Sequence, residues 1–108
     1  MRILLFTWML AALASAPVTL LAAEPEQNGR ALFEDRCALC HRGSGPGVFM
    51  LERRLGKDQS ILEERNNLAP DYIRTVARWG VGSMPRFTRG EINDTELNAI
   101  AGYLVKSE

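Results

Sequence analysis

The sequence has very few of the side chains that most often bind metal ions in proteins. Its 108 residues contain one histidine and two cysteines. These three residues lie within one pentapeptide, as Cys37, Cys40 and His41. Whatever chemistry they perform, they perform as one unit.

Long hydrophobic runs are absent after residue 23. Before that point, a basic start is followed by an almost uninterrupted apolar run over residues 3–21, which ends in small residues. This order is typical of a secretory signal peptide. The run is long enough for an uncleaved anchor, but Pro17 interrupts it. We predict a signal peptide over residues 1–23 that is cleaved after Ala23, with Ala16 as a second candidate site.

The remaining segment, residues 24–108, lacks an excess of charge of either sign. Removing 23 of the 108 residues leaves 85, with 12 basic and 13 acidic side chains, because Arg2 is the only charged residue lost. Binding to a phosphate backbone requires a basic excess, so no nucleic acid is expected as a partner. We predict one exported, periplasmic domain without stable membrane insertion after signal cleavage.

The sequence does contain the motif Cys-x-x-Cys-His at residues 37–41. Residues three apart lie on the same side of a helical turn, so both cysteines can form thioethers with the vinyl groups of one porphyrin. His41 follows directly, where one ring nitrogen can reach the iron as an axial ligand. This pattern predicts one covalently bound haem c, held by Cys37 and Cys40. Because so short a chain forms a marginal core, we expect the haem-free chain to be poorly folded.

Three other interpretations of the same residues are weaker. A thioredoxin-like redox site follows a strand in a βαβ unit, whereas the residues before Cys37 have a helical pattern. A structural zinc site usually needs four nitrogen or sulfur ligands, and this chain offers three. A disulfide would close a very short loop and leave His41 unexplained.

The sequence offers few candidates for the second axial position of the iron. There is no second histidine, and two of the four methionines lie in the predicted signal peptide. Met50 follows His41 by only nine residues, so we interpret it as a core side chain that fills space. Met84 has more than forty residues in which the chain can cross the haem edge, and it lies in a loop between Gly82 and Pro85. We therefore predict Met84 as the second iron ligand.

Helical patterns cover much of the chain, and no alternation typical of strands is present. After a flexible lead-in, we predict a helix from Gly29 to Arg36 capped by Gln27 or Asn28. A glycine-rich loop after His41 should give way to an amphipathic turn over residues 48–55. An irregular segment with a turn of helix around residues 61–62 should follow.

Two later helices have clearer boundaries. Pro70 begins the first of them and Gly80 ends it. Asn93 and Glu96 form a capping pattern for the second, whose apolar residues repeat at helical spacing. The prediction is a small all-α domain of three to five helices wrapped round one haem.

Other residues at characteristic positions resemble a known family. Gly29 and Phe33 precede the haem motif at intervals of four, a Gly-Ser-Met-Pro segment contains Met84, and the final helix carries Tyr103. With these motifs, nearly the whole chain after the leader resembles a class I c-type cytochrome. The resemblance implies the small monohaem cytochrome c fold, in which Gly29 and Phe33 pack against the last helix near Tyr103.

The same resemblance gives Pro46 a role beside the iron. Its carbonyl oxygen would accept a hydrogen bond from the second ring nitrogen of His41 and so fix that ligand. The residues alone allow Pro46 to be a loop-forming residue only.

A narrower similarity concerns residues 51–55, 68–73 and 79–85. These segments are similar to the cytochrome subunits of flavoprotein dehydrogenases that act on phenols such as 4-cresol or eugenol. This similarity implies a flavoprotein dehydrogenase as the redox partner, together with a downstream electron acceptor.

The helix before Met84 supplies a further candidate for haem binding. Trp79 could donate its indole N–H to a haem propionate, because its helix leads directly into the Met84 loop. Several arginines could pair with propionates or could be solvated surface charges, namely Arg53, Arg54, Arg74, Arg78 and Arg86.

Histidine and methionine ligation of one iron favours electron transfer rather than an enzyme reaction at the metal. We predict a periplasmic electron carrier that acts as the cytochrome subunit of a flavoprotein dehydrogenase. One alternative is a free soluble shuttle to a terminal oxidase. The other is an open-site haem enzyme or gas sensor, in which Met84 is not bound to the iron and Tyr72, Arg78 or Arg86 supplies a polar group.

Overall fold

The computed structural model describes residues 25–105, so the predicted signal peptide and its cleavage site lie outside the described residues. This region is helical, with five α-helices and two short 3₁₀ helices. They are α1 (Pro25–Arg36), α2 (Ala38–His41), α3 (Pro46–Leu55), η1 (Lys57–Gln59), η2 (Leu62–Glu64), α4 (Pro70–Trp79) and α5 (Asp94–Leu104). Within residues 25–105 there is no strand, only an isolated bridge between Val81 and Met84. The prediction of a small all-α domain is confirmed.

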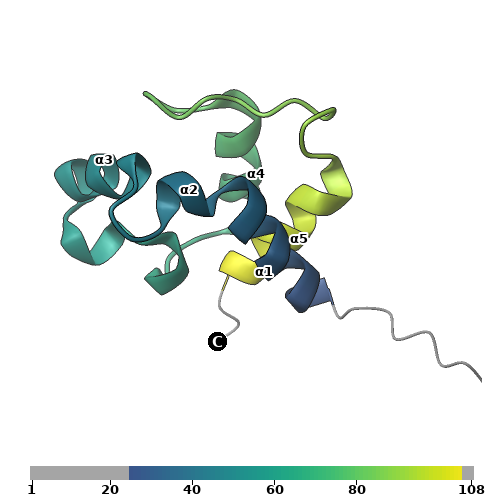
Figure 1. Cartoon of the computed structure of the whole chain (residues 1–108), viewed down its shortest axis with the longest axis horizontal. Helices are drawn as coiled ribbons and strands as arrows, with labels where there is room; N and C mark the ends of the chain where they lie inside the picture. Colours follow the sequence, from purple (N-terminus) through teal and green to yellow (C-terminus); the bar gives the residue numbers. More distant parts are fainter. Residues whose placement is uncertain (1–24, 106–108) are drawn as a thin grey trace, which may run out of the picture.

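The first and last helices form the central contact of the fold (Figure 1). Gly29 of α1 lies against α5, where an added Cβ would overlap the carbonyl oxygen of Ala99 and come within 2.9 Å of the Cβ of Tyr103. One turn later, the fully buried Phe33 places its ring centroid 5.7 Å from that of Tyr103. The predicted packing of Gly29 and Phe33 against the last helix is therefore confirmed.

We expect a Gly29→Val substitution to destabilise the holoprotein by about 1–3 kcal/mol, because the added side chain would force the two helices apart. Urea unfolding of the haem-loaded protein measures this loss. Gly102→Ala is the matched control, since no atom lies within 4 Å of a Cβ at this position of α5. There, alanine should stabilise the helix by about 0.5–1 kcal/mol. Equal stability of the Gly29→Val variant and the wild type would contradict the close crossing.

Helix starts and ends agree with local sequence signals at most positions. α5 has a full capping box, with the Glu96 N–H donating to Asn93 Oδ1 at 2.9 Å and the Asn93 N–H donating to Glu96 Oε2 at 2.8 Å. α4 begins at Pro70 and ends before Gly80, whose φ of 71° is in the left-handed region. Both predicted boundaries are confirmed.

Two helices begin earlier than predicted, and each begins at a proline. α1 starts at Pro25, so the prediction of a flexible lead-in with a cap at Gln27 or Asn28 is wrong. α3 starts at Pro46 rather than at residue 48. Proline suits the first position of a helix because its missing N–H would have no partner there.

The buried core is small and lies between α1, α4, α5 and the segments that join them. Its connected apolar cluster consists of Phe33, Leu68, Ala77, Ile92, Leu97, Ile100 and Leu104. None of the helices described between residues 25 and 105 is long and apolar enough to cross a membrane.

Candidate functional site

A largely apolar cavity of about 270 Å³ opens beside this core. All seven residues of the core cluster also line the cavity. The core of the domain is therefore at the same time the wall of a binding site. Cavities of this kind hold ligands that are mostly apolar and carry a few polar groups.

Five of the six predicted site residues lie together on this cavity. They are Cys37, Cys40, His41, Pro46 and Met84. They come from three parts of the fold, namely α2 with its preceding residue, the start of α3 and the loop after α4. The fold thus brings the haem motif and the distant Met84 to one place.

The haem motif forms a single turn of helix. Cys37 precedes α2, and its carbonyl oxygen accepts hydrogen bonds from the N–H groups of Cys40 at 3.1 Å and His41 at 3.0 Å. This turn keeps both sulfurs and the imidazole at the cavity wall. The local geometry is the one that attachment of two adjacent vinyl groups requires.

The Cys37 environment argues against a redox-active thiol. Burial, and then the neighbouring Cys40, raise the pKa of the Cys37 thiol to about 11. Reactive Cys-x-x-Cys sites have the opposite property, since their attacking thiol has a lowered pKa. Within the part of the chain that the structure describes, no group of three or more His, Cys, Asp or Glu side chains is arranged to hold a metal ion.

His41 is held as a neutral ring. Burial lowers the pKa of its imidazole, because the cationic form would lose solvation. A neutral imidazole is the form that binds a metal. Among the described residues, no atom forms a hydrogen bond with the buried His41 Nδ1, so the predicted bond to the Pro46 carbonyl is not formed in this structure.

The wall behind His41 is made of glycine backbone. An added Cβ at Gly47 would lie 3.0 Å from both Nδ1 and Cε1 of His41, and 2.7 Å from the carbonyl oxygen of Cys40. An added Cβ at Gly45 would lie 2.6 Å from the same carbonyl. Gly45 and Gly47 therefore pack closely against the haem motif, a feature that the Gly-Pro-Gly segment of the sequence could have indicated.

Met84 is half-buried in a tight loop. Its N–H donates to the Val81 carbonyl at 2.9 Å, and its own carbonyl accepts from the Val81 N–H at 3.2 Å. Gly80 and Gly82 both have positive φ, at 71° and 55°, and allow this sharp turn. Met50 lines the same cavity from α3, so the structure brings both methionines to the site.

Three arginines line the cavity, whereas no Asp or Glu within residues 25–105 does. They are Arg36, Arg54 and Arg65. Arg65 is only 9% exposed. Its Nε donates to Asn67 Oδ1 at 2.9 Å, and no carboxylate in the described region pairs with it. Burial of a cation without an anion is costly, so the site suits a ligand that brings carboxylates of its own. Haem has two, its propionates, and arginine binds carboxylates well.

Arg54 was among the arginines predicted from the sequence as candidates for haem propionates, whereas Arg65 was not. Arg65 lies in the segment predicted as irregular, where no periodic pattern indicates burial. Three of the other named arginines, Arg74, Arg78 and Arg86, do not line the cavity, nor does Arg53.

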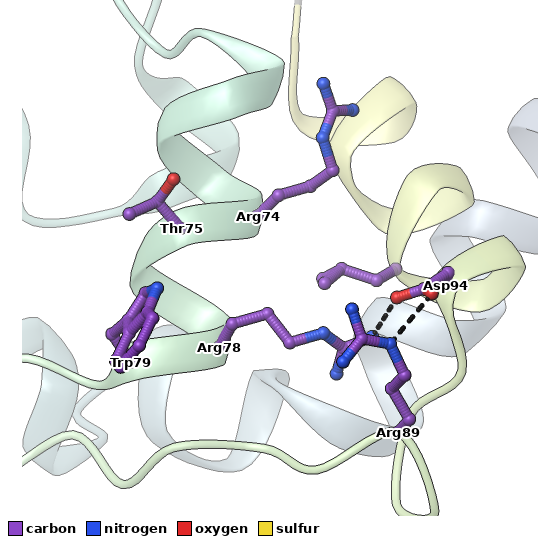
Figure 2. Close-up of a pocket in the computed structure, with 7 residues that line it drawn as sticks. Arg74, Thr75, Arg78, Trp79, Arg89 and Asp94 are labelled. Atoms are coloured by element: carbon purple, nitrogen blue, oxygen red, sulfur yellow. Dashed lines mark hydrogen bonds and ion pairs between the residues drawn. The ribbon is translucent and has the colours of Figure 1, made fainter.

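Trp79 lies apart from the other predicted site residues. Its side chain is 78% exposed at the end of α4 and borders a separate cleft of about 220 Å³ with Arg74, Arg78 and Arg89. In this cleft Arg78 and Arg89 both donate to Asp94, at 2.8 Å and 3.0 Å (Figure 2). Residues Ile73, Val76 and Ala77 of the same helix line the haem cavity instead. The role of Trp79 at a propionate stays a prediction.

The residues present fit a covalently bound haem. Two thiols and a neutral imidazole lie on one turn, a methionine lies on the same cavity, the wall is apolar, and unpaired arginines are available for two carboxylates. Every one of these features comes from residues within the described region.

Comparison with known proteins agrees with this geometry. Residues 24–104 match the sequence model of the family described as cytochrome C oxidase, cbb3-type, subunit III. Cytochrome c6 of Synechococcus elongatus is 32% identical over 78 residues, which cover 72% of this chain and 85% of that protein. Cytochrome c6 of Petalonia fascia is also 32% identical over 78 residues, covering 72% and 87%. No solved structure matches significantly.

Proposed function

Because the chain belongs to this family of c-type cytochromes, which bind haem covalently and transfer electrons, we propose that it is a periplasmic one-electron carrier with His41 and Met84 as its iron ligands. In this proposal Cys37 and Cys40 attach the haem. The supporting observation is that both cysteines and both proposed ligands line one cavity whose wall is the core of the domain.

The residues of the chain perform distinct tasks in this site. His41 is kept neutral by burial, and the absence of a side chain at Gly47 leaves room for its ring, since an added Cβ there would lie 3.0 Å from Nδ1 and Cε1. The Met84 loop presents a thioether from the other end of the chain, and a methionine ligand raises the reduction potential. The haem, when bound, supplies a one-electron couple between ferric and ferrous iron. The apolar wall of the cavity would keep water away from the iron.

A redox partner would approach at the rim of the cavity. Val81, Gly82 and Pro85 line the cavity on the Met84 side, and Val81 is 43% exposed. Leu39, within the haem motif, is 87% exposed. Small apolar groups beside a haem edge suit a modest, transient interface.

We propose a free shuttle rather than a permanent dehydrogenase subunit. The relatives reported above are cytochromes c6, and neither their names nor that of the family refers to a flavoprotein dehydrogenase. The flavoprotein partner therefore stays a hypothesis that depends on the narrower sequence similarity alone. Co-purification from the native host distinguishes the two, because a permanent subunit would elute with a flavin-containing protein.

Visible spectra of the holoprotein test the proposed ligands. The ferric protein should show the charge-transfer band of methionine-bound iron, and the ferrous protein should not bind carbon monoxide. Absence of the band, together with ready carbon monoxide binding, would replace this proposal with the open-site alternative. In that case Tyr72, which lines the cavity and is 54% exposed, would be the first candidate for the polar group.

A further inference from the structure

A network of charged side chains lies directly behind the haem motif and has no role in the function proposed so far. Its centre is Arg42, the residue after the proposed iron ligand His41. The guanidinium of Arg42 binds both oxygens of Glu63, with Nε at 2.9 Å from Oε2 and Nη2 at 2.6 Å from Oε1. This two-point geometry is the strongest form of a pair between arginine and a carboxylate.

Several parts of the fold meet at this pair. Glu63, of η2, also accepts a hydrogen bond from the hydroxyl of Tyr103 on α5. The Arg42 guanidinium lies 5.7 Å from the ring centroid of Phe33 on α1, and its Nη1 is 3.4 Å from Oε1 of Glu34. The Arg42 side chain, which follows the haem motif, thus contacts α1 and η2 directly and is linked to α5 through Glu63.

The haem turn has few other means of being held in place. α2 has four residues, none of them fully buried, and no side chain caps its N-terminus. Its last hydrogen bond runs from the Arg42 N–H to the Ala38 carbonyl at 3.0 Å. Arg42 follows His41 directly, and its side chain binds Glu34 and Glu63 outside the turn.

The network is also electrically balanced. Arg42 and Arg30 supply two positive charges, and Glu34 and Glu63 supply two negative charges, with Arg30 Nε 3.2 Å from Glu34 Oε1. The hydrogen bond from Arg42 lowers the pKa of Glu63, and Glu63 raises the pKa of Tyr103. At neutral pH the carboxylate is therefore charged and the phenol is neutral. Loss of a single charge would leave its partner uncompensated next to the haem motif, since Arg42 follows His41 directly.

We propose that Arg42 and Glu63 are a positioning pair that holds the His41 turn in place and keeps the reduction potential of the iron from shifting in either direction. This inference rests on the proposed haem function. Loss of the positive charge should favour the ferric state, which is the more positive one, and loss of the negative charge should favour the ferrous state.

Redox titration of the holoprotein tests the proposal through shifts of opposite sign. Arg42→Gln should lower the reduction potential and Glu63→Gln should raise it. Each variant should change the equilibrium constant for reduction of the iron by roughly threefold to tenfold, and a tenfold change corresponds to about 59 mV. The double variant Arg42→Gln/Glu63→Gln should return close to the wild-type potential, because the net charge is restored. A merely structural role would not give shifts of opposite sign.

Two further variants complete the experiment. Arg89→Gln removes the same charge from an exposed pair with Asp94 and should change the equilibrium by less than about twofold. Arg42→Lys keeps the charge and loses the two-point geometry, so it should keep the potential and lower the midpoint of thermal unfolding. If Arg42→Gln does not fold, the reduction potentials of Glu63→Gln and Arg42→Lys still test the proposal. Only Glu63→Gln changes the charge, so only this variant should have a shifted potential.

Shifts of the same sign, or shifts no larger than that of Arg89→Gln, would overturn the proposal. Its failure is separate from failure of the haem function, which the wild-type spectrum tests. If the wild-type protein shows the methionine band but the variants show no shift in reduction potential, the proposed haem function stands and the proposed role of the Arg42–Glu63 pair is wrong.

Discussion

Replacing Met84 with alanine is expected to change the iron from a closed, electron-transfer site to an open one. The charge-transfer band of the ferric protein should disappear, carbon monoxide should bind the ferrous protein stoichiometrically, and the reduction potential should fall strongly because the thioether ligand is lost. The reason lies in the position of Met84 on the cavity wall, in a loop shaped by Gly80 and Gly82. Optical spectra with and without carbon monoxide measure the charge-transfer band and carbon monoxide binding. A redox titration measures the reduction potential.

Met50→Ala is the matched control for this experiment. Met50 lines the same cavity but belongs to α3, which begins only five residues after His41. Met50 is 43% exposed, so its expected role as a space-filling core side chain is not borne out. The Met50 variant should keep the wild-type spectrum and lose less stability than the about 2–5 kcal/mol that truncation of a fully buried methionine costs. If Met50→Ala, and not Met84→Ala, abolished the band, the assignment of the second ligand would be reversed.

Removing the haem attachment is expected to abolish cooperative folding. In the Cys37→Ala/Cys40→Ala variant we expect weak helical circular dichroism and no cooperative urea transition, whereas the holoprotein should show both. All seven residues of the core cluster also line the cavity, so without the haem one side of this small core would be left without packing partners. A chain of this size has no second core to compensate.

Single-cysteine variants provide the control for this loss. Cys37→Ala and Cys40→Ala each leave one thiol for attachment, so a haem-containing, folded fraction should remain in both. A double variant with a cooperative transition and full helical signal would show that the helices form a core without the haem. In that case the core would have to repack across the cavity.

The local features of the site could be predicted from the sequence because they obey short-range rules. Cys37, Cys40 and His41 lie on one helical turn wherever that turn is placed, and the structure forms this turn. The start of α5 was equally predictable, since its capping box uses only residues three apart. The starts of α1 and α3 were placed too late, because polar and glycine-rich residues outweighed a proline that suits a first helical position.

Contacts between distant segments could not be predicted in this way. Trp79 precedes the Met84 loop in sequence, yet its side chain borders a separate cleft at the end of α4 (Figure 2), and its role at a propionate stays a prediction. Arg65 has no sequence pattern that indicates burial, and the pairing of Arg42 with Glu63 joins residues 21 apart. None of these positions is set by helical periodicity.

The sequence by itself determined that the protein attaches one haem, that His41 is the one histidine available as a ligand and that the domain is helical. These properties follow from a motif, a composition and a periodicity, each of which is complete within a short segment. Only the tertiary structure decided that Met84 reaches the haem cavity, that Gly47 lies against His41 and that a buried arginine is available for an anionic group. The physical reason is that burial and facing contacts depend on how α1, α4 and α5 pack, and this packing is fixed by the whole chain at once.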